Sequence, residues 1–193
     1  MTTTPPKTFL ILHGFENHRP EGHWQHWLAG QLRERGHAVR YPQLPEPDAP
    51  VLADWLDALE EHGARPEEGE FVVLAHSLSV LLWLRAAATV DADRVLLVAP
   101  PSPPVTASVP EIAAFGEGLD LDAVRPEAPA RLVYGDGDPY CPEGADVHYG
   151  IPLGLDMDHV PGGGHLNPAF GYGAWASVLD WCENPETRVG GCR

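Results

Sequence analysis

Six short runs of mostly apolar residues recur along the chain, separated by segments of helical or irregular character. The runs are TFLILHG, HAVRYP, EFVVLAHS, RVLLVAP, ARLVYGD and LDMDHVPG. They contain many β-branched residues and lack clean alternation of polar and apolar positions, which is typical of strands buried on both faces of a parallel sheet. The predicted fold class is therefore α/β, a mostly parallel sheet of about six strands with helices on both faces.

The segments between the runs predict four helices, at residues 22–35, 50–62, 79–88 and 171–182. Residues 100–122 differ, because the stretch PPSPPVTASVPEIAAFGEG is too rich in proline and small residues for one regular element. We interpret residues 101–118 as a loop or short lid over the strand ends. The 193 residues contain no repeat and predict a single domain, 1–193, with flexible tails at 1–7 and 184–193.

Charge and cysteine content narrow the classes of partner and compartment. The net charge of −16 disfavours nucleic acid, because affinity for phosphate backbones comes largely from clustered Lys and Arg. Cys141, Cys182 and Cys192 are odd in number and form no C-x-x-C pair, so a reducing compartment is expected. No stretch approaches the roughly 18 apolar residues of a spanning helix. We therefore predict a soluble, cytoplasmic protein with no nucleic-acid or membrane partner.

The stretch FVVLAHSLSV, residues 71–80, places Ser77 between a predicted buried strand and a predicted helix. A nucleophile elbow holds its serine at such a joint, in the pattern G-x-S-x-G. Ala75 and Ser79 stand at the two glycine positions here, and both side chains are small enough for the turn. The alternative interpretation is that Ser77 is an ordinary helix N-cap.

The residues that follow the apolar runs are the candidates for chemistry, because open parallel sheets bind ligands beyond the carboxyl ends of their strands. Ser77 follows the third run, and His165 follows the sixth. A serine hydroxyl needs a base within hydrogen-bond reach and an acid that orients the base. We assign these roles to His165 and Asp138. Asp138 lies far enough beyond the fifth run for its loop to bend back toward the site, and Asp136 is the alternative.

Other residues at the strand ends fit the same chemistry. Three glycines precede His165 and would let its loop hold the imidazole beside the serine. The oxyanion of an acyl-transfer intermediate needs hydrogen-bond donors. The backbone amides of Leu78 and Phe15 are the expected pair, with Glu16 as the second choice for the latter. His76 is interpreted as supporting the turn and not as the base.

Large apolar residues near the strand ends are candidates for a substrate pocket, although any one of them alone is more typical of a core. The predicted pocket residues are Trp24, Phe115, Tyr140 and Leu166. His23 and His26 are one helical turn apart, but no H-E-x-x-H pattern and no evident third ligand accompany them, so no metal is predicted. No phosphate-binding or dinucleotide-binding glycine motif is present, so no cofactor is predicted.

Five motifs, FLILHGF, GHWQHWLAGQL, AHSLS, YGDGDPYCP and GGGHLNP, together extend over most of the chain. In this combination the chain resembles the small α/β-hydrolases of the serine hydrolase family that includes retinoblastoma-binding protein 9 and its compact bacterial relatives. The resemblance implies an α/β-hydrolase fold with a minimal cap and a triad of Ser77, Asp138 and His165. The chain departs from the family at Ser79, where glycine is common, and in its proline-rich loop.

These observations predict a cofactor-free serine hydrolase that cleaves a small ester, thioester or amide through an acyl-enzyme on Ser77. The expected partner is a small acyl substrate. Two alternatives remain. A protein with this fold can be a scaffold without activity, because fold alone does not fix function. The same triad can also open lactones or thioesters in secondary metabolism.

Overall fold

The computed structural model describes residues 7–124 and 128–192. The described residues form a sheet of six strands in the order β2-β1-β3-β4-β5-β6, and every neighbouring pair is parallel. The strands are β1 (Thr8–Leu12), β2 (Ala38–Arg40), β3 (Phe71–His76), β4 (Arg94–Val98), β5 (Ala130–Gly135) and β6 (Asp156–Val160). The predicted α/β-hydrolase type of sheet is confirmed.

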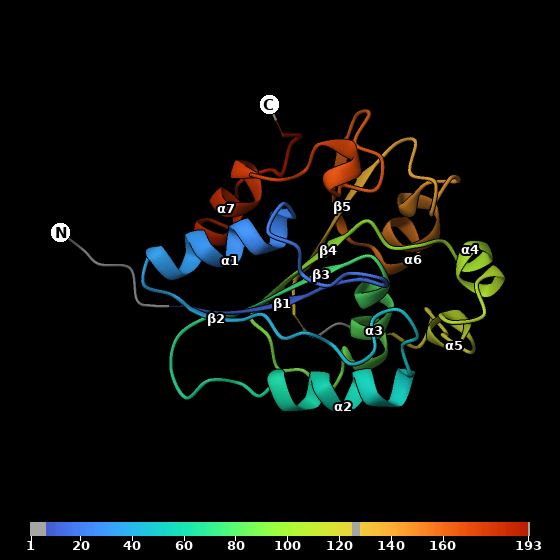
Figure 1. The fold of residues 1–193 in the computed structure, drawn as a ribbon, viewed down its shortest axis with the longest axis horizontal. Helices are drawn as coiled ribbons and strands as arrows, with labels where there is room; N and C mark the ends of the chain where they lie inside the picture. The colour runs from blue at the N-terminus through green and yellow to red at the C-terminus, as the bar shows by residue number, and fades with distance from the viewer. Residues whose placement is uncertain (1–6, 125–127, 193) are drawn as a thin grey trace.

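Both faces of the sheet are covered, which explains why the strand sequences show no clean alternation. Phe9 and Ile11 of β1 point into one apolar cluster, and Leu10 and Leu12 point into the other. Helices α1 (Trp24–Glu34) and α7 (Ala176–Glu183) lie together on one face, while α2 (Leu52–His62) and α3 (Leu78–Ala86) lie on the opposite face (Figure 1). The four helices expected from the sequence are therefore present, although α7 begins later than predicted.

The proline-rich segment is more regular than the sequence prediction of a loop. It forms α4 (Pro103–Ser108) and α5 (Ala113–Gly116), which pack together at one end of the sheet (Figure 1). The prolines fall in the first turn of α4, where the missing N–H group costs no intrahelical bond, and Ser102 caps that turn. Three short elements were also not predicted: η1 (Asp146–Gly150), α6 (Ile151–Leu153) and η2 (Pro168–Phe170).

The end of the chain is packed against the sheet, which differs from the expectation of a flexible tail at 184–193. Val189 is buried and donates its N–H to the Asp158 carboxylate, and Arg188 forms ion pairs with Asp156 and Asp158. Lys7 is also buried and donates to the carbonyls of Cys182 and Glu183 at the end of α7. Residues 1–6 of the expected N-terminal tail, and residue 193, lie outside the described residues.

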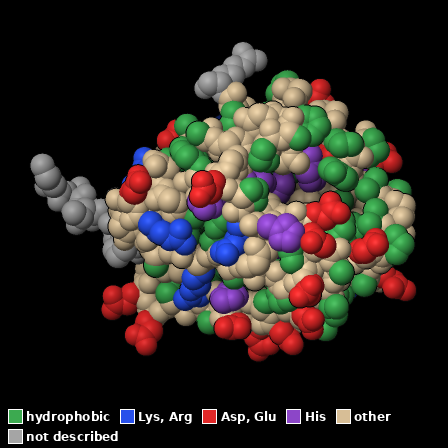
Figure 2. Space-filling model, in the orientation of Figure 1, with side chains coloured by type: hydrophobic (Ala, Val, Ile, Leu, Met, Phe, Trp, Pro, Cys, Tyr) green, Lys and Arg blue, Asp and Glu red, His purple; other side chains and the backbone are tan. Residues whose placement is uncertain are grey.

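Acidic side chains are scattered around the margin of the molecule, while Lys and Arg side chains gather to the left of centre on the face shown in Figure 2. The acidic residues behind the net charge are thus spread over this face as a solvated surface. In the ranges that the structure describes, no helix combines the length and apolar character needed to cross a membrane.

Candidate active site

Ser77 lies in a sharp turn between β3, which ends at His76, and α3, which begins at Leu78. Its backbone has φ 56° and ψ −123°, a conformation that strains any residue with a Cβ. Such strain is characteristic of a nucleophile elbow, which exposes the serine hydroxyl above the strand ends. Ser77 stands at the N-cap position of α3, but its side chain makes no capping hydrogen bond with any described residue. The N-cap interpretation is therefore not supported.

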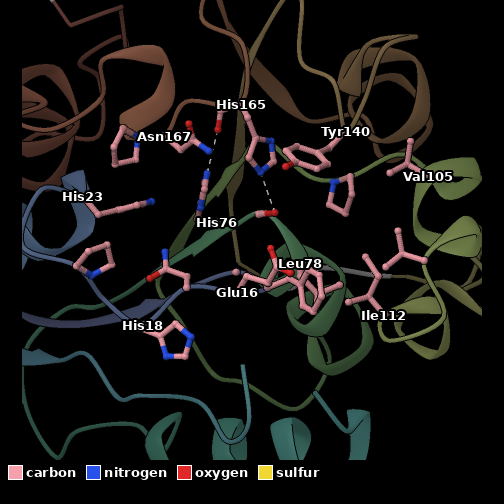
Figure 3. Close-up of a pocket in the computed structure, with 18 residues that line it drawn as sticks. Glu16, His18, His23, His76, Leu78, Val105, Ile112, Tyr140, His165 and Asn167 are labelled. Carbon is pink, nitrogen blue, oxygen red and sulfur yellow. Dashed lines mark hydrogen bonds between the residues drawn. The ribbon is translucent and has the colours of Figure 1, made fainter. Parts of the chain in front are cut away.

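The structure brings Ser77, His165 and Asp138 together in one hydrogen-bonded chain (Figure 3). The Ser77 hydroxyl lies 3.0 Å from His165 Nε2, and His165 Nδ1 lies 2.8 Å from Asp138 Oδ2. Because a carboxylate only accepts, Nδ1 carries the proton, and Nε2 is left to accept from the serine. Asp138 and His165 are both buried, and the second carboxylate oxygen of Asp138 accepts the Tyr140 N–H.

Asp136, the alternative acid, points elsewhere. Its exposed carboxylate accepts the N–H of Gly162 and lies 3.4 Å from His159 Nε2. It therefore helps to fix the loop after β6 and does not orient His165. Gly164 in the same loop has φ 53°, and a Cβ at that position would overlap the ring of Phe170. Both the backbone angle and the close contact require glycine there.

The amides expected to hold an oxyanion lie on either side of the serine. Phe15 and Leu78 both line the cavity above Ser77, and their N–H groups have no hydrogen-bond partner within the described ranges. The second-choice amide, that of Glu16, donates to the carbonyl of Pro47 at 2.8 Å. Gly14 allows this approach, because a Cβ there would lie 2.8 Å from the Cβ of Ser77. The loop after β1 is thus packed directly against the turn that carries the serine.

Ser79, which departs from the glycine of the elbow pattern, is fully buried and hydrogen-bonded. Its hydroxyl donates to the carbonyl of His13 at the end of β1. The extra side chain is therefore accommodated, and it ties the first turn of α3 to the loop that supplies the Phe15 amide. With Ser79 in place, the Ser77 hydroxyl lies 3.0 Å from His165 Nε2.

Neutral histidines surround the triad. The Nε2–H of His76 donates to the carbonyl of His165 at 3.1 Å, and burial holds the pKa of His76 well below 6.5. His23 lines the cavity and caps α1 by accepting the N–H of Gln25, and burial lowers its pKa to about 4. His13 accepts the N–H of Leu44, and burial lowers its pKa to about 4 as well. These rings remain uncharged at neutral pH.

The two histidines of α1 are not arranged as metal ligands. His23 is engaged in the helix cap, whereas His26 is exposed and its ring contacts the carbonyl of Arg19. Across the described part of the chain, no group of three or more His, Cys, Asp and Glu side chains is placed to hold a metal ion.

A cavity of about 460 Å³ opens above Ser77. It is lined by residues from the segments that follow β1, β3, β4, β5 and β6. Of the four predicted pocket residues, Tyr140 lines it, and its ring centroid lies 4.5 Å from that of His165. Trp24, Phe115 and Leu166 are fully buried in the core instead and are not among the described residues that line the cavity. Trp24 packs on Trp175 beneath the site.

Several lining residues were not predicted from the sequence. They are Val105, Val109 and Ile112 from the α4–α5 segment, together with Asn17, His18, His23 and Asn167. The interpretation of residues 101–118 as a loop or short lid places this segment over the strand ends, but it does not identify which residues face the cavity, because that depends on how the two short helices pack. The G-H-L-N motif after β6 did single out the neighbourhood of Asn167.

Comparisons with known proteins identify the family and support the fold. The model of a family described as serine hydrolase matches residues 9–184. No curated protein matches the sequence. The chain is similar in structure to the YdeN gene product of Bacillus subtilis, with a TM-score of 0.77, 22% identity, and coverage of 92% of this chain and 97% of that chain.

Two further solved structures show the same fold at lower identity. A YdeN-like hydrolase from Pectobacterium atrosepticum has a TM-score of 0.72 and 19% identity over 94% of this chain and 91% of that chain. An esterase domain of a Rhodothermus marinus protein has a TM-score of 0.67 and 16% identity over 91% of this chain and 85% of that chain. The family model matches nearly the whole length of this chain, and the chain therefore belongs to the serine hydrolase family.

Proposed function

We propose that the protein hydrolyses a small ester, thioester or amide through an acyl-enzyme on Ser77. The observation that carries the proposal is the chain of two hydrogen bonds, 3.0 Å from the Ser77 hydroxyl to His165 and 2.8 Å from His165 to Asp138. This pair of hydrogen bonds begins at a serine in a strained turn. Beside the serine lie two backbone N–H groups that have no hydrogen-bond partner among the described residues. A serine hydroxyl with a base, an orienting acid and oxyanion donors is equipped for acyl transfer.

In the first step the Ser77 oxygen attacks the substrate carbonyl carbon while its proton moves to His165 Nε2. The carbonyl electron pair moves onto oxygen, and the resulting oxyanion lies between the N–H groups of Leu78 and Phe15. Asp138 stabilises the imidazolium and holds its ring in place. The intermediate then expels the leaving group, which takes the proton from Nε2.

The second step releases the acyl group. Water gives a proton to His165 Nε2 as its oxygen attacks the acyl carbon, and a second oxyanion forms at the same two amides. When this intermediate collapses, the proton returns to the Ser77 oxygen and a carboxylic acid departs. The family and the esterase-domain neighbour support esters as the first substrates to test.

The proposal is tested by treating the purified protein with a fluorophosphonate probe and mapping the modified residue by mass spectrometry. We expect an adduct on Ser77, lost in Ser77→Ala and in His165→Ala. The control is Ser108→Ala, which removes an exposed hydroxyl on α4 that bonds within its own helix. This variant should label at the wild-type rate.

An unlabelled but folded protein would contradict the proposal and favour the alternative of a scaffold on a hydrolase fold, which has no need of an activated serine. If Ser77 is labelled, a panel of simple esters, lactones and thioesters separates a general esterase from an enzyme that opens lactones or thioesters. The probe result and the panel therefore answer different questions.

A further inference from the structure

The cavity above Ser77 has two halves of different chemistry. One half is apolar and is lined by Val105, Val109, Ile112, Pro101, Tyr140 and Leu78. The other half is more polar and is lined by Glu16, Asn17, His18, His23 and Asn167, with Pro20 and Pro168 beside them. Figure 3 shows Val105, Ile112 and Tyr140 on one side of His165, and His18, His23 and Asn167 on the other.

The apolar half is built on a fixed wall. Phe115 of α5 is fully buried and packs edge-on against Trp55, with ring centroids 5.2 Å apart. The guanidinium of Arg85, on α3, donates to the carbonyls of Phe115 and Ala114. These contacts attach α5 to the same helix that begins at the nucleophile turn. A wall held in this way selects ligands by size, because it does not adapt freely to longer chains.

The order of the two chemical steps decides which half receives which part of the substrate. The water that releases the acyl group must give its proton to His165 Nε2, so it takes the place that the leaving group has vacated. A water molecule there needs further polar partners. The polar half supplies them through His23 and Asn167, whereas the apolar half supplies none comparable from Val105, Val109 or Ile112.

We propose that the apolar half holds the acyl chain and that the polar half holds the leaving group and, later, the hydrolytic water. The inference rests on the proposed acyl-enzyme on Ser77. It assigns the substrate class as esters or thioesters of short aliphatic acids with a polar alcohol or thiol. It also assigns Val105, Val109 and Ile112 as the residues that set acyl-chain preference.

The test uses p-nitrophenyl phosphonates that carry methyl, butyl or hexyl chains on phosphorus, because capture of Ser77 by these reagents requires no turnover. In the wild type we expect the capture rate to rise with chain length by up to about fourfold for each methylene that enters the apolar half. Val109→Trp narrows this half and should lower the hexyl-to-methyl rate ratio at least tenfold. Ile112→Ala widens it and should raise the hexyl-to-butyl rate ratio above its wild-type value.

The matched control places the same large side chain in the polar half. His18 is exposed, and His18→Trp should leave the hexyl-to-methyl ratio at its wild-type value. The same variant should reduce hydrolysis of a hexanoyl ester of glycerol relative to the p-nitrophenyl ester. Circular dichroism confirms that each variant is folded before its rates are compared.

The outcomes separate the two proposals. Capture of Ser77 at rates that do not depend on chain length overturns the assignment of the halves and leaves the acyl-enzyme mechanism intact. A change of the chain-length ratio in His18→Trp but not in Val109→Trp shows that the halves are reversed. Failure of every phosphonate, the methyl one included, to modify Ser77 overturns the proposed function itself.

Discussion

At the scale of single residues, His76 connects the turn that carries the nucleophile to the loop that carries the base. Its ring is buried, and its Nε2–H donates to the backbone carbonyl of His165 at 3.1 Å. The rings of His76 and His165 have centroids 5.1 Å apart. His76 also borders the cavity, but its Nε2–H is engaged with the His165 carbonyl, so we expect it to position His165 against Ser77.

We expect His76→Leu to slow fluorophosphonate capture of Ser77 by about 10- to 100-fold, because a small displacement of the imidazole weakens proton transfer. His76→Gln keeps an N–H donor at nearly the same distance from the backbone and should recover most of that rate. The measurement is the second-order capture rate for both variants, beside their melting temperatures. Equal rates in the two variants would show that the hydrogen bond to His165 is not what matters.

The two aspartates after β5 show what the sequence settles at this scale and what it leaves open. Asp136 and Asp138 stand in the same G-D-G-D turn, and turn preferences alone do not separate them. The structure separates them because the loop after β6, far along the chain, supplies the Gly162 N–H that binds Asp136. That contact is non-local, so no pattern around residue 136 reveals it.

At the scale of elements, the contact between the loop after β1 and the start of α3 holds the oxyanion donors in place. Gly14 in this loop has no room for a side chain, because a Cβ would lie 2.8 Å from Ser77 Cβ and 3.2 Å from its hydroxyl oxygen. The Ser79 hydroxyl binds the same loop through the carbonyl of His13. Any added volume at Gly14 must displace either the nucleophile or the amide of Phe15.

Gly14→Ala should therefore reduce capture of Ser77 by at least about 100-fold while the protein remains folded, since loss of one oxyanion donor alone costs about that much. Gly30→Ala is the matched control, because Gly30 lies within α1 and a Cβ there meets no atom within 4 Å. This control should keep the wild-type rate and raise the free energy of unfolding by about 0.5–1 kcal/mol. Similar rates in the two alanine variants would contradict the assigned role of the loop.

The segment between β4 and β5 shows where sequence reasoning about elements fails. Its proline content favoured an irregular loop, yet Pro103 and Pro104 occupy the first turn of α4, where proline is tolerated. The sequence S-P-P is typical of a helix start, but the high proline content of the whole segment favoured the loop interpretation. Which of its residues face the cavity depends on the packing of Phe115 beneath it, and the sequence holds no periodicity long enough to predict this.

At the scale of the whole molecule, the burial of neutral histidines links folding to pH. Burial lowers the pKa of His13 and of His23 to about 4 and holds that of His76 well below 6.5. In the unfolded chain these groups titrate near 6.5. Between pH 6.5 and pH 4 the unfolded state therefore binds more protons than the folded state, and acid favours unfolding.

The free energy of unfolding should thus be independent of these residues above pH 6.5 and should fall as the pH drops toward 4. The slope is up to about 1.4 kcal/mol per pH unit for each histidine. His23→Asn keeps an N-cap acceptor for α1 but cannot titrate. Urea unfolding at pH 8, 7, 6 and 5 should show a shallower decline for this variant than for the wild type. Parallel curves over that range would contradict the assignment of His23.

The six-stranded parallel sheet was predictable because each strand is a local apolar run.

The strand order β2-β1-β3-β4-β5-β6 has a consequence for folding to the active form. Ser77 and His165 lie 88 residues apart in the sequence, and His165 follows the edge strand β6. The hydroxyl gains its base only after β4, β5 and β6 have been added beside β3. Contacts of such long range form late in folding. During refolding, Ser77 should therefore become reactive toward a phosphonate only after the helical circular dichroism signal has returned. The time at which this reactivity appears would report when the last strand docks.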